Sequence, residues 1–333
     1  MPLRLLAVET SCDETAAALV GDDFTVESSV VASQALAHAA YGGVVPELAA
    51  RMHLERIAGV VSEALVPVEG DLTRLAGVAV TRGPGLVGSL AVGANYAQAL
   101  AAAAGLPVVG VNHMTGHILA ARVADPRLAP PFVALVVSGG HTDLVHYQAH
   151  DRVELMGATR DDAVGEAFDK VARMLGLAYP GGPEIDRVAA SGDPSKYRLP
   201  RPVLPHFSFS FSGLKTAVLY LVRDLGELDE QQVADIAASF RLAAVETLCA
   251  QLEAAVEQTG CSRVVLAGGV ASNHLLRRMA VERLRGIAWV TIPEPQLCTD
   301  NAAMIGAAGW TKVARSGFEG EPFAAEPGLR AYA

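Results

Sequence analysis

The fold is decided by a stretch in the middle of the chain, FVALVVSGGHTDLVHY, residues 132–147. Its apolar first part, Phe132–Val137, predicts a β-strand, and Asp143–Tyr147 predicts a second strand that returns beside it. The glycine-rich residues between them, Ser138–Thr142, predict a tight turn. Such a turn lets backbone N–H groups approach an anion such as a phosphate, although an ordinary hairpin turn gives the same pattern.

The same pattern occurs at the start of the chain, where the apolar run Leu3–Val8, a polar turn and the run Ala16–Val20 follow one another. Each half of the chain then carries a further strand, a glycine turn and a helix, at residues 77–88 and at residues 263–273. A pattern that occurs twice indicates an internal duplication. Strands that alternate with helices predict an α/β fold whose sheets are covered by helices.

A proline-rich segment, Asp125–Pro131, predicts the linker between the two halves. We therefore expect an N-terminal lobe at residues 1–127 and a C-terminal lobe at residues 128–333. Ligand sites favour domain interfaces, so we expect the active site in a cleft between the lobes. The irregular stretch Tyr179–Ser212 is long for a loop in a compact domain, which indicates either a functional loop or a disordered one.

Composition narrows the class of protein. Hydrophobic residues make up 51% of the 333 residues, which is enough for large cores, and the net charge is −10. The four cysteines form no C-x-x-C pair, and the apolar start is too short for a signal peptide, so we expect a cytoplasmic protein. The most apolar stretch, Leu90–Val111, is interrupted by polar residues, glycine and proline, so we expect no membrane span.

The motif VNHMTGH, residues 111–117, places His113 and His117 four residues apart, on one face of a helix. Two imidazoles so placed suit one metal ion, and a pair of half-buried histidines is the alternative interpretation. Asp300 or Thr299 stands where the N-cap of the following apolar helix is expected. A carboxylate there could complete a two-histidine, one-carboxylate metal set with open positions. A zinc peptidase helix would need Glu in place of Met114.

Further glycine-rich turns and carboxylates suggest a nucleotide. The turn Gly268-Gly269 opens a helix, and the positive end of a helix dipole favours anions. It matches neither a P-loop nor a Rossmann fingerprint. Asp169 and Asp186 lie near glycine-rich sequence, where carboxylates commonly hold ribose hydroxyls or a ligand amine. Solvated surface charges are the alternative interpretation for each of them.

Taken together, these motifs resemble one family over nearly the whole chain, the tRNA N6-adenosine threonylcarbamoyltransferases, known in bacteria as TsaD and formerly called O-sialoglycoprotein endopeptidases. The motifs, in chain order, are VETSCDET (8–15), GVVPELA (43–49), TRGPG (81–85), VNHMTGH (111–117), VVSGGHT (136–142), FSFSGLK (209–215), LAGGVASN (266–273) and Asp300. So many separate motifs in one order make the resemblance specific. It implies the duplicated two-lobed fold of the actin, sugar kinase and Hsp70 superfamily.

The resemblance also implies the chemistry. It implies transfer of an L-threonylcarbamoyl group from threonylcarbamoyl-AMP to adenosine 37 of tRNAs that read codons beginning with A, with release of AMP. It implies one iron or zinc ion held by His113, His117 and Asp300. The residues that it implies for binding the adenylate are Val136, Val137, Ser138, Gly139, Gly140, Asp169, Gly182, Asp186 and Asn273. The sequence decides no general base; Glu9, Asp13 and Glu14 beside the first turn are candidates.

The resemblance further implies two protein partners, an inert paralogue of the same fold (TsaB type) and a small P-loop ATPase (TsaE type). An acidic chain needs local basic residues or partners to bind tRNA. A basic cluster lies in irregular sequence, and we expect it to contact tRNA, with a solvated loop as the alternative: Lys196, Arg198, Arg201, His206 and Lys215.

Two other functions fit parts of the pattern. An ATP-dependent small-molecule kinase of the same superfamily would use the turns but would not need the histidine pair. The inert paralogue would be expected to lack the metal set, which this chain retains.

Overall fold

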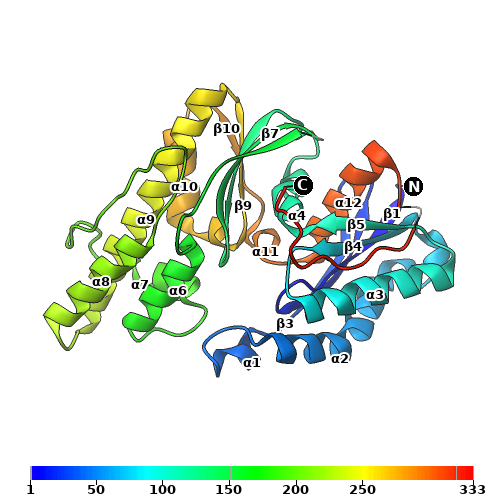
Figure 1. Ribbon diagram of the computed structural model, residues 1–333, viewed down its shortest axis with the longest axis horizontal. Coiled ribbons are helices and arrows are strands. Elements are labelled where there is room, and N and C mark those ends of the chain that lie inside the picture. Colours follow the sequence, from blue (N-terminus) through cyan, green and yellow to red (C-terminus); the bar gives the residue numbers. More distant parts are fainter. Residues whose placement is uncertain (1, 151, 320, 333) are drawn as a thin grey trace. The chain divides into compact units, whose positions relative to one another are not determined.

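The computed structural model describes residues 2–150, 152–319 and 321–332. The chain forms two compact units, one comprising Met1–Leu128 with Pro293–Ala333 and the other comprising Ala129–Ile292. Each unit is built on a five-stranded sheet, and Figure 1 labels its strands and helices.

The first sheet has the strand order β3-β2-β1-β4-β5. Its strands are β1 (Arg4–Glu9), β2 (Glu14–Gly21), β3 (Val26–Ser33), β4 (Gly77–Gly83) and β5 (Val108–Asn112). Strands β1 and β2 form the predicted hairpin, whereas β1, β4 and β5 are parallel neighbours. The helices of this unit are α1 (Ala35–Ala39), α2 (Pro46–Ala64), α3 (Val87–Ala104), α4 (His113–Leu119), α5 (Ala121–Ala124), α11 (Pro295–Cys298) and α12 (Ala302–Ser316).

Helices cover both faces of the first sheet, and successive side chains of each strand point to opposite faces. Leu6 and Val8 of β1 join a buried cluster with Ile57 of α2 and Ala97 of α3. The intervening residues of β1 face the other way, toward α12. The strand therefore lies between two helical layers, which explains why it is apolar at nearly every position.

The C-terminal segment lies in a different unit from the one predicted. The sequence predicts a second lobe at residues 128–333, but Pro293–Ala333 belongs to the first unit. The prediction was wrong because the segment that carries α12 packs on strands from the start of the chain. Chain order did not indicate this long-range contact.

Glycines allow the close approach of α12 to the first sheet. A Cβ atom on Gly306 would lie 2.4 Å from Val20 Cγ2, and one on Gly309 would lie 2.8 Å from Ala79 Cβ. Any larger residue would push the helix away from the strands. The apolar pattern of α12 was visible in the sequence, but which sheet it covers was not.

The second sheet has the order β10-β9-β6-β7-β8. Taken from its other edge, this is β8-β7-β6-β9-β10, which matches β3-β2-β1-β4-β5 of the first sheet strand by strand. Its strands are β6 (Phe132–Val137), β7 (Thr142–Ala149), β8 (Arg152–Ala158), β9 (Arg263–Ala267) and β10 (Trp289–Thr291). The helices are α6 (Val164–Met174), α7 (Gly181–Val188), α8 (Ser212–Leu225), α9 (Glu230–Thr259) and α10 (His274–Arg283). The repeated topology confirms the predicted duplication and α/β class.

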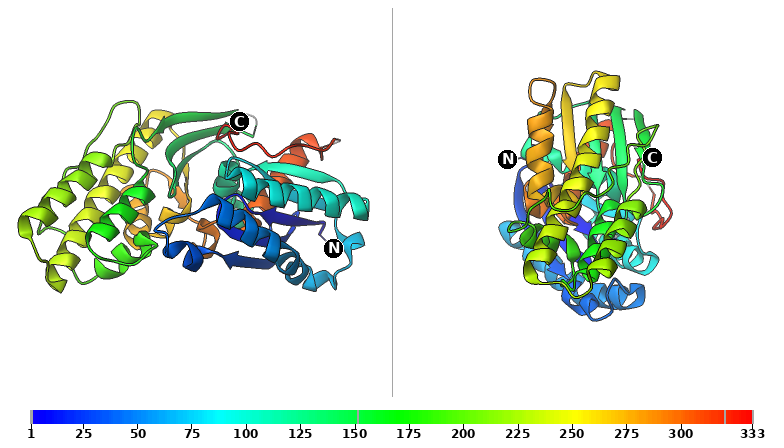
Figure 2. Two further views of the ribbon diagram at one scale, coloured as in Figure 1. Left: turned by 60° about the horizontal axis from the view of Figure 1, so that its bottom comes forward. Right: turned by 90° about the vertical axis from the view of Figure 1, so that its left-hand side faces the viewer.

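The long helix α9 packs against β6 and β7 and contacts α7, α8 and α10, and Figure 2 shows these helices from two further sides. Helix α7 lies within the stretch 179–212 that the sequence left irregular. None of the described helices is both long enough and apolar enough to span a bilayer.

Candidate functional site

The two histidines of the predicted motif lie on α4, directly after β5. The side-chain oxygen of Asn112 caps this helix by accepting hydrogen bonds from the backbone N–H groups of Met114 and Thr115, at 2.9 and 3.2 Å. The rings of His113 and His117 meet edge to face with their centroids 4.7 Å apart. The predicted shared face is therefore confirmed.

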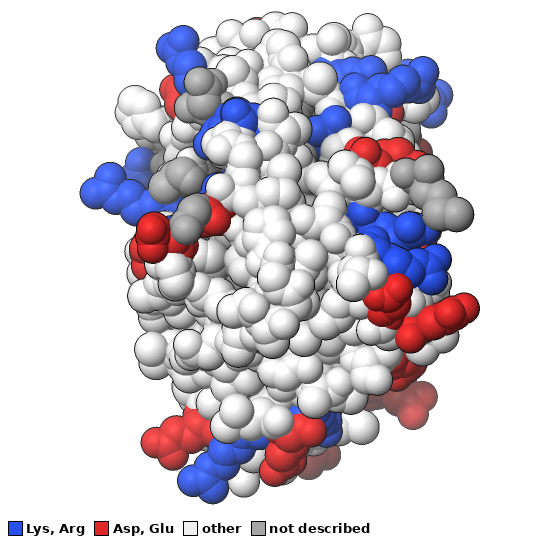
Figure 3. Space-filling model, turned by 90° about the vertical axis from the view of Figure 1, so that its right-hand side faces the viewer, with Lys and Arg blue, Asp and Glu red and all other residues white. Residues whose placement is uncertain are grey.

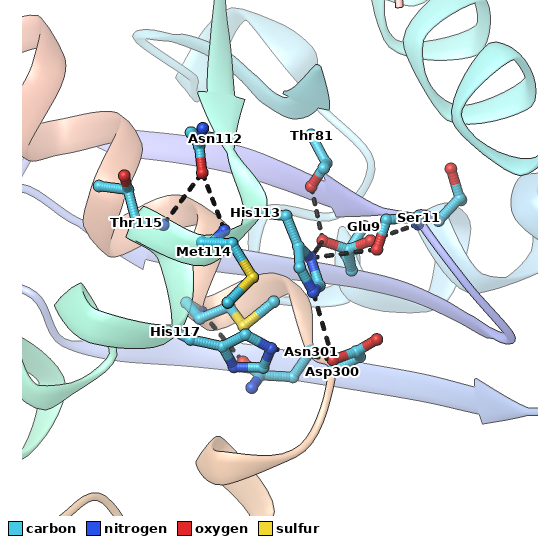
Figure 4. A network of polar contacts seen from close by, with 12 residues as sticks. Glu9, Ser11, Thr81, Asn112, His113, Met114, Thr115, His117, Asp300 and Asn301 are labelled. Carbon is cyan, nitrogen blue, oxygen red and sulfur yellow. Dashed lines mark hydrogen bonds and ion pairs between the residues drawn. The ribbon is translucent and has the colours of Figure 1, made fainter. Parts of the chain in front are cut away.

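Asp300 joins the histidines from the segment between α11 and α12. Its Oδ1 lies 3.6 Å from Nε2 of His113 and 3.2 Å from Nε2 of His117, as Figure 4 shows. The donor atoms of the three residues all lie within 4.8 Å of one another. His117 is buried, whereas the Asp300 side chain keeps 21% of its surface exposed, so the cluster is open on the carboxylate side.

The N-cap of α12 is Asn301, not Asp300 or Thr299 as predicted. Asn301 Oδ1 accepts a hydrogen bond from Met304 N at 2.9 Å, which satisfies the start of the helix. The prediction erred by one residue because Asp and Asn are equally good caps and stand next to each other. Asp300 is thereby left free to face the histidines.

The donor set fits a divalent transition metal. Two imidazole nitrogens and one carboxylate are ligands that iron and zinc accept, and three protein ligands leave coordination positions for a substrate. Among the described residues, His113, His117 and Asp300 form a group of three ligand side chains that lie close enough together to hold one ion.

Glu9, predicted as a candidate catalytic residue, lies beneath the cluster at the end of β1. Its carboxylate is fully buried, and Oε2 lies 3.0 Å from His113 Nδ1 and accepts a hydrogen bond from Thr81 Oγ1 at 2.6 Å. Oε1 accepts a hydrogen bond from the backbone N–H of Ser11. A carboxylate on one ring nitrogen of a histidine fixes the ring so that the other nitrogen can bind a metal.

These charges shift one another's pKa values. Burial disfavours the imidazolium form of His113, but Asp300 and Glu9 outweigh burial and raise the pKa of His113 to about 9. Burial likewise opposes ionisation of Asp300, but His113 and His117 outweigh it and lower the pKa of Asp300 to about 2. The pKa of Glu9 is also lowered, because His113 offsets its burial. His113 and the carboxylates of Glu9 and Asp300 therefore stabilise one another's charged forms.

The remaining acidic candidates lie beside this cluster. Burial, and then the neighbouring carboxylates Asp300 and Asp13, raise the pKa of Glu14 to about 9. Glu14 Oε1 accepts a hydrogen bond from Ser33 Oγ at 3.1 Å. Asp13 is partly exposed in the turn between β1 and β2. Glu14 is therefore protonated near neutral pH, and Asp13 remains a candidate base.

The residues predicted to bind the adenylate lie in the second unit. Val136 and Val137 end β6, and the Ser138 hydroxyl accepts hydrogen bonds from the N–H groups of Gly140 and His141, at 3.3 and 3.1 Å. Gly139 and Gly140 are exposed, and a Cβ atom on either would meet nothing within 4 Å. The turn thus presents open backbone.

Gly268 closes onto this turn from the end of β9. Its φ is +85°, and a Cβ atom there would lie 2.4 Å from the carbonyl oxygen of Val137. Only glycine combines that backbone conformation with that approach. The two glycine turns predicted from sequence are therefore neighbours.

Asp186 and Asn273 are brought into direct contact. Asn273 Nδ2 donates to Asp186 Oδ1 at 3.0 Å, while Asn273 Oδ1 caps α10 through Leu276 N. Arg241 of α9 also donates to Asp186 Oδ1, at 2.6 Å. Sequence reasoning missed Arg241, because a single Arg inside a long helix gave no signal.

Asp169 and Gly182 lie at the contact between α6 and α7. Asp169 Oδ1 accepts a hydrogen bond from Gly181 N at 2.7 Å. Burial raises the pKa of Asp169, although the N–H groups of Gly181 and Gly182 oppose the rise. The carboxylate of Asp169 therefore fixes the start of α7, the helix that contains Asp186.

Comparison with known proteins identifies the family. The sequence profile described as "TsaD: tRNA N6-adenosine threonylcarbamoyltransferase" matches residues 25–307. The chain belongs to this family. A relative named tRNA N6-adenosine threonylcarbamoyltransferase from Geobacter metallireducens is 55% identical over 312 residues, which cover 92% of this chain and 91% of the relative. One of the same name from Symbiobacterium thermophilum is 53% identical over 310 residues, covering 92% and 90%.

Solved structures support the fold. HypF from T. kodakarensis superimposes with a TM-score of 0.63 at 14% identity, over 94% of this chain and 48% of that one. The activator of 2-hydroxyisocaproyl-CoA dehydratase from Clostridium difficile superimposes with a TM-score of 0.52 at 12% identity, over 96% and 99%. These likenesses show that the chain shares its α/β fold with both proteins.

We expect His113→Ala and Asp300→Ala to lose the bound metal while the chain stays folded, because each removes one of three ligands. Metal content after dialysis would be measured by mass spectrometry, and folding by circular dichroism. His274→Ala, which removes an exposed histidine in the second unit, is the control and should retain its metal. Full metal occupancy in both ligand variants would refute the assignment.

Metal affinity should rise with pH. In the metal-free chain His113 has a pKa of about 9, so it carries a proton at pH 7 that the ion must displace. Loss of one proton on binding predicts an affinity that rises about tenfold per pH unit from pH 7 and levels off above the pKa. Because Glu9 contributes to the raised pKa of His113, the metal affinity of the Glu9→Gln variant should level off at a lower pH. Titration with zinc at several pH values measures both; a pH-independent affinity would contradict the ion-pair network.

Proposed function

We propose that this chain transfers the L-threonylcarbamoyl group from threonylcarbamoyl-AMP to the exocyclic amine of adenosine 37 in tRNAs that read codons beginning with A, releasing AMP. Membership of the threonylcarbamoyltransferase family supports the reaction class. The single observation that carries the proposal is the convergence of His113, His117 and Asp300. A kinase of the same fold would have no need of this cluster.

The transfer reaction depends more on positioning the two substrates than on a strong base. The exocyclic amine of adenosine is a weak nucleophile, because its lone pair is delocalised into the ring, whereas the acyl phosphate is already activated. Rate must then come from orienting the two substrates and from stabilising the charge that leaves with AMP. An iron or zinc ion held by His113, His117 and Asp300 would supply a Lewis acid for that charge.

We assign distinct roles to the acidic residues. Glu9 is a positioning residue, because both of its oxygens are engaged and one of them holds the His113 ring. Asp13 is the candidate that takes the proton from the attacking amine, since it is partly exposed in the turn that follows Glu9. Glu14 is a weaker candidate for this base, because burial raises its pKa and favours its neutral form.

The second unit is proposed to hold the adenylate. The turn formed by Val136, Val137, Ser138, Gly139 and Gly140 is proposed to approach a phosphate, since Gly139 and Gly140 leave its backbone exposed. Asp169, Gly182, Asp186 and Asn273 are the proposed contacts of the nucleoside and the threonyl group. Arg241 and Asn273 both hold Asp186, so its carboxylate has a fixed orientation for a ribose hydroxyl.

Proteins of two kinds are proposed as partners, an inert paralogue of the same fold (TsaB type) and a small P-loop ATPase (TsaE type). The proposed setting is the cytoplasm, where tRNA substrates and free thiols are found. All four cysteines are free in the structure.

Reconstitution tests the function directly. The chain, both partners, a source of threonylcarbamoyl-AMP and unmodified tRNA would be combined, and digested tRNA analysed for the modified nucleoside by mass spectrometry. We expect product with the native chain and none with Asp300→Ala. Product formation by the metal-free Asp300→Ala variant at the native rate would refute the role of the cluster.

Gly140→Val should separate nucleotide binding from folding. The structure leaves open space at this position, so a valine fits the fold but would occupy the proposed phosphate approach. We expect about tenfold weaker binding of a non-hydrolysable adenylate analogue, or about 1.4 kcal/mol. Gly59→Val, at an exposed position with equally open space in the first unit, is the control. Calorimetry measures both, and equal affinities would place the phosphate elsewhere.

The predicted tRNA-contacting cluster divides in the structure. Arg201 pairs with Glu246 and Lys215 pairs with Asp162, so these charges are partly neutralised. Lys196 and Arg198 are exposed. The face of the molecule in Figure 3 has a broad area without Lys, Arg, Asp or Glu, and its charges lie around the rim. That face shows no continuous basic surface among the described residues.

Changing Lys196 and Arg198 together to Ala should weaken tRNA binding by the assembled complex and flatten its salt dependence. Each lost phosphate contact is expected to lower the slope of log affinity against log salt by about one. Arg127→Ala is the control, because this arginine is 90% exposed but belongs to the first unit. Unchanged slope and affinity in the double variant would show that tRNA docks on other residues.

A further inference from the structure

The second unit contains a cavity of about 590 Å³ that the proposed reaction does not use. It lies at the beginning of β6, beside the residues that join α9 to β9. Its lining includes Pro130, Pro131, His146, Gln148 and Cys261. No residue assigned above to the metal or to the adenylate lines it.

Two reactive side chains meet in this cavity. Sγ of Cys261 lies 3.5 Å from Nε2 of His146, within the range of a hydrogen bond to sulfur. Cys261 follows the end of α9, and His146 lies on β7, two strands away from β9 in the sheet. The contact is therefore made by the tertiary fold and has no signal in the sequence.

A carboxylate stands behind the imidazole. Glu154 of β8 is the cross-strand partner of His146, and its Oε2 lies 3.9 Å from His146 Nδ1. Gln148 Nε2 donates to the same oxygen at 2.6 Å and also lies 3.4 Å from His146 Nδ1, so it bridges the ring and the carboxylate. The thiol therefore contacts the imidazole, and the carboxylate lies behind the ring at ion-pair distance.

The other cysteines lie in different surroundings. Burial raises the pKa of Cys249 to about 12, and burial together with Asp300 and Asp13 raises the pKa of Cys12. Cys298 is buried and donates to the carbonyl oxygen of Pro293 at 3.5 Å. Cys261 differs from these three in having a ring nitrogen that can accept its proton beside a cavity.

We propose that Cys261, His146 and Glu154 form a thiol site that reacts with hydrogen peroxide. Only 5% of the surface of Cys261 is exposed, which favours a small reagent over a bulky electrophile. The thiol passes its proton to His146 Nε2, and the sulfur attacks one peroxide oxygen. The S–O bond forms as the O–O bond breaks, and the leaving hydroxide takes the proton to become water. The product is Cys261 sulfenic acid, which thiols reduce again.

The test uses the full chain loaded with zinc, because zinc has no redox chemistry of its own. The chain would be exposed to hydrogen peroxide for increasing times, then denatured in dimedone, and the labelled cysteines would be mapped by peptide mass spectrometry. We expect Cys261 to be labelled about tenfold faster than Cys249 and Cys298, since a positioned proton acceptor accelerates such steps by this much or more. Cys249 and Cys298 serve as internal controls in the same sample.

His146→Gln keeps a polar side chain of similar size but removes the proton acceptor. It should slow labelling of Cys261 about tenfold and leave Cys249 and Cys298 unchanged. Glu154→Gln should slow Cys261 less, because Glu154 acts only through the imidazole. Equal labelling of all cysteines in the native chain would overturn the proposal. So would a rate at Cys261 that His146→Gln leaves unchanged or raises, in a chain whose circular dichroism is native.

Discussion

The first unit depends on one buried charge, the carboxylate of Glu9 at the end of β1. An uncompensated carboxylate inside a protein costs several kcal/mol, so it must be fully hydrogen-bonded. Thr81 from β4, the backbone of Ser11 and the ring of His113 together meet this demand. The parallel strands β1, β4 and β5 end at the same edge of the sheet, which brings these groups together. The carboxylate thus fixes the histidine that begins α4.

The rest of the cluster follows from how the chain covers the sheet. Helix α12 returns from the end of the sequence to the first sheet, and Gly306 and Gly309 let it approach closely. Asn301 caps that helix, which leaves the residue before it, Asp300, facing His113 and His117. Residues nearly two hundred positions apart therefore form one site within one unit, of the kind that accepts iron or zinc.

Much of this was predictable from local sequence. The strand patterns gave the duplication, and the four-residue spacing of His113 and His117 gave their shared face. The resemblance supplied Asp300, because spacing alone could not distinguish a ligand from a cap. Three features were not predictable. They are the membership of α12 in the first unit, the contact of Glu9 with His113, and the contact of Arg241 with Asp186. Each depends on packing between distant segments, which no local pattern records.

The central claim is that Glu9 orients His113 so that His113, His117 and Asp300 hold one metal ion. A crystal of the metal-loaded chain, measured at the absorption edge of the metal, tests it most directly. We predict one anomalous peak at about 2.0–2.2 Å from Nε2 of both histidines and from an oxygen of Asp300. Glu9 should remain bonded to Nδ1 of His113. A peak bound elsewhere, or one bound through Nδ1 of His113, would contradict the account.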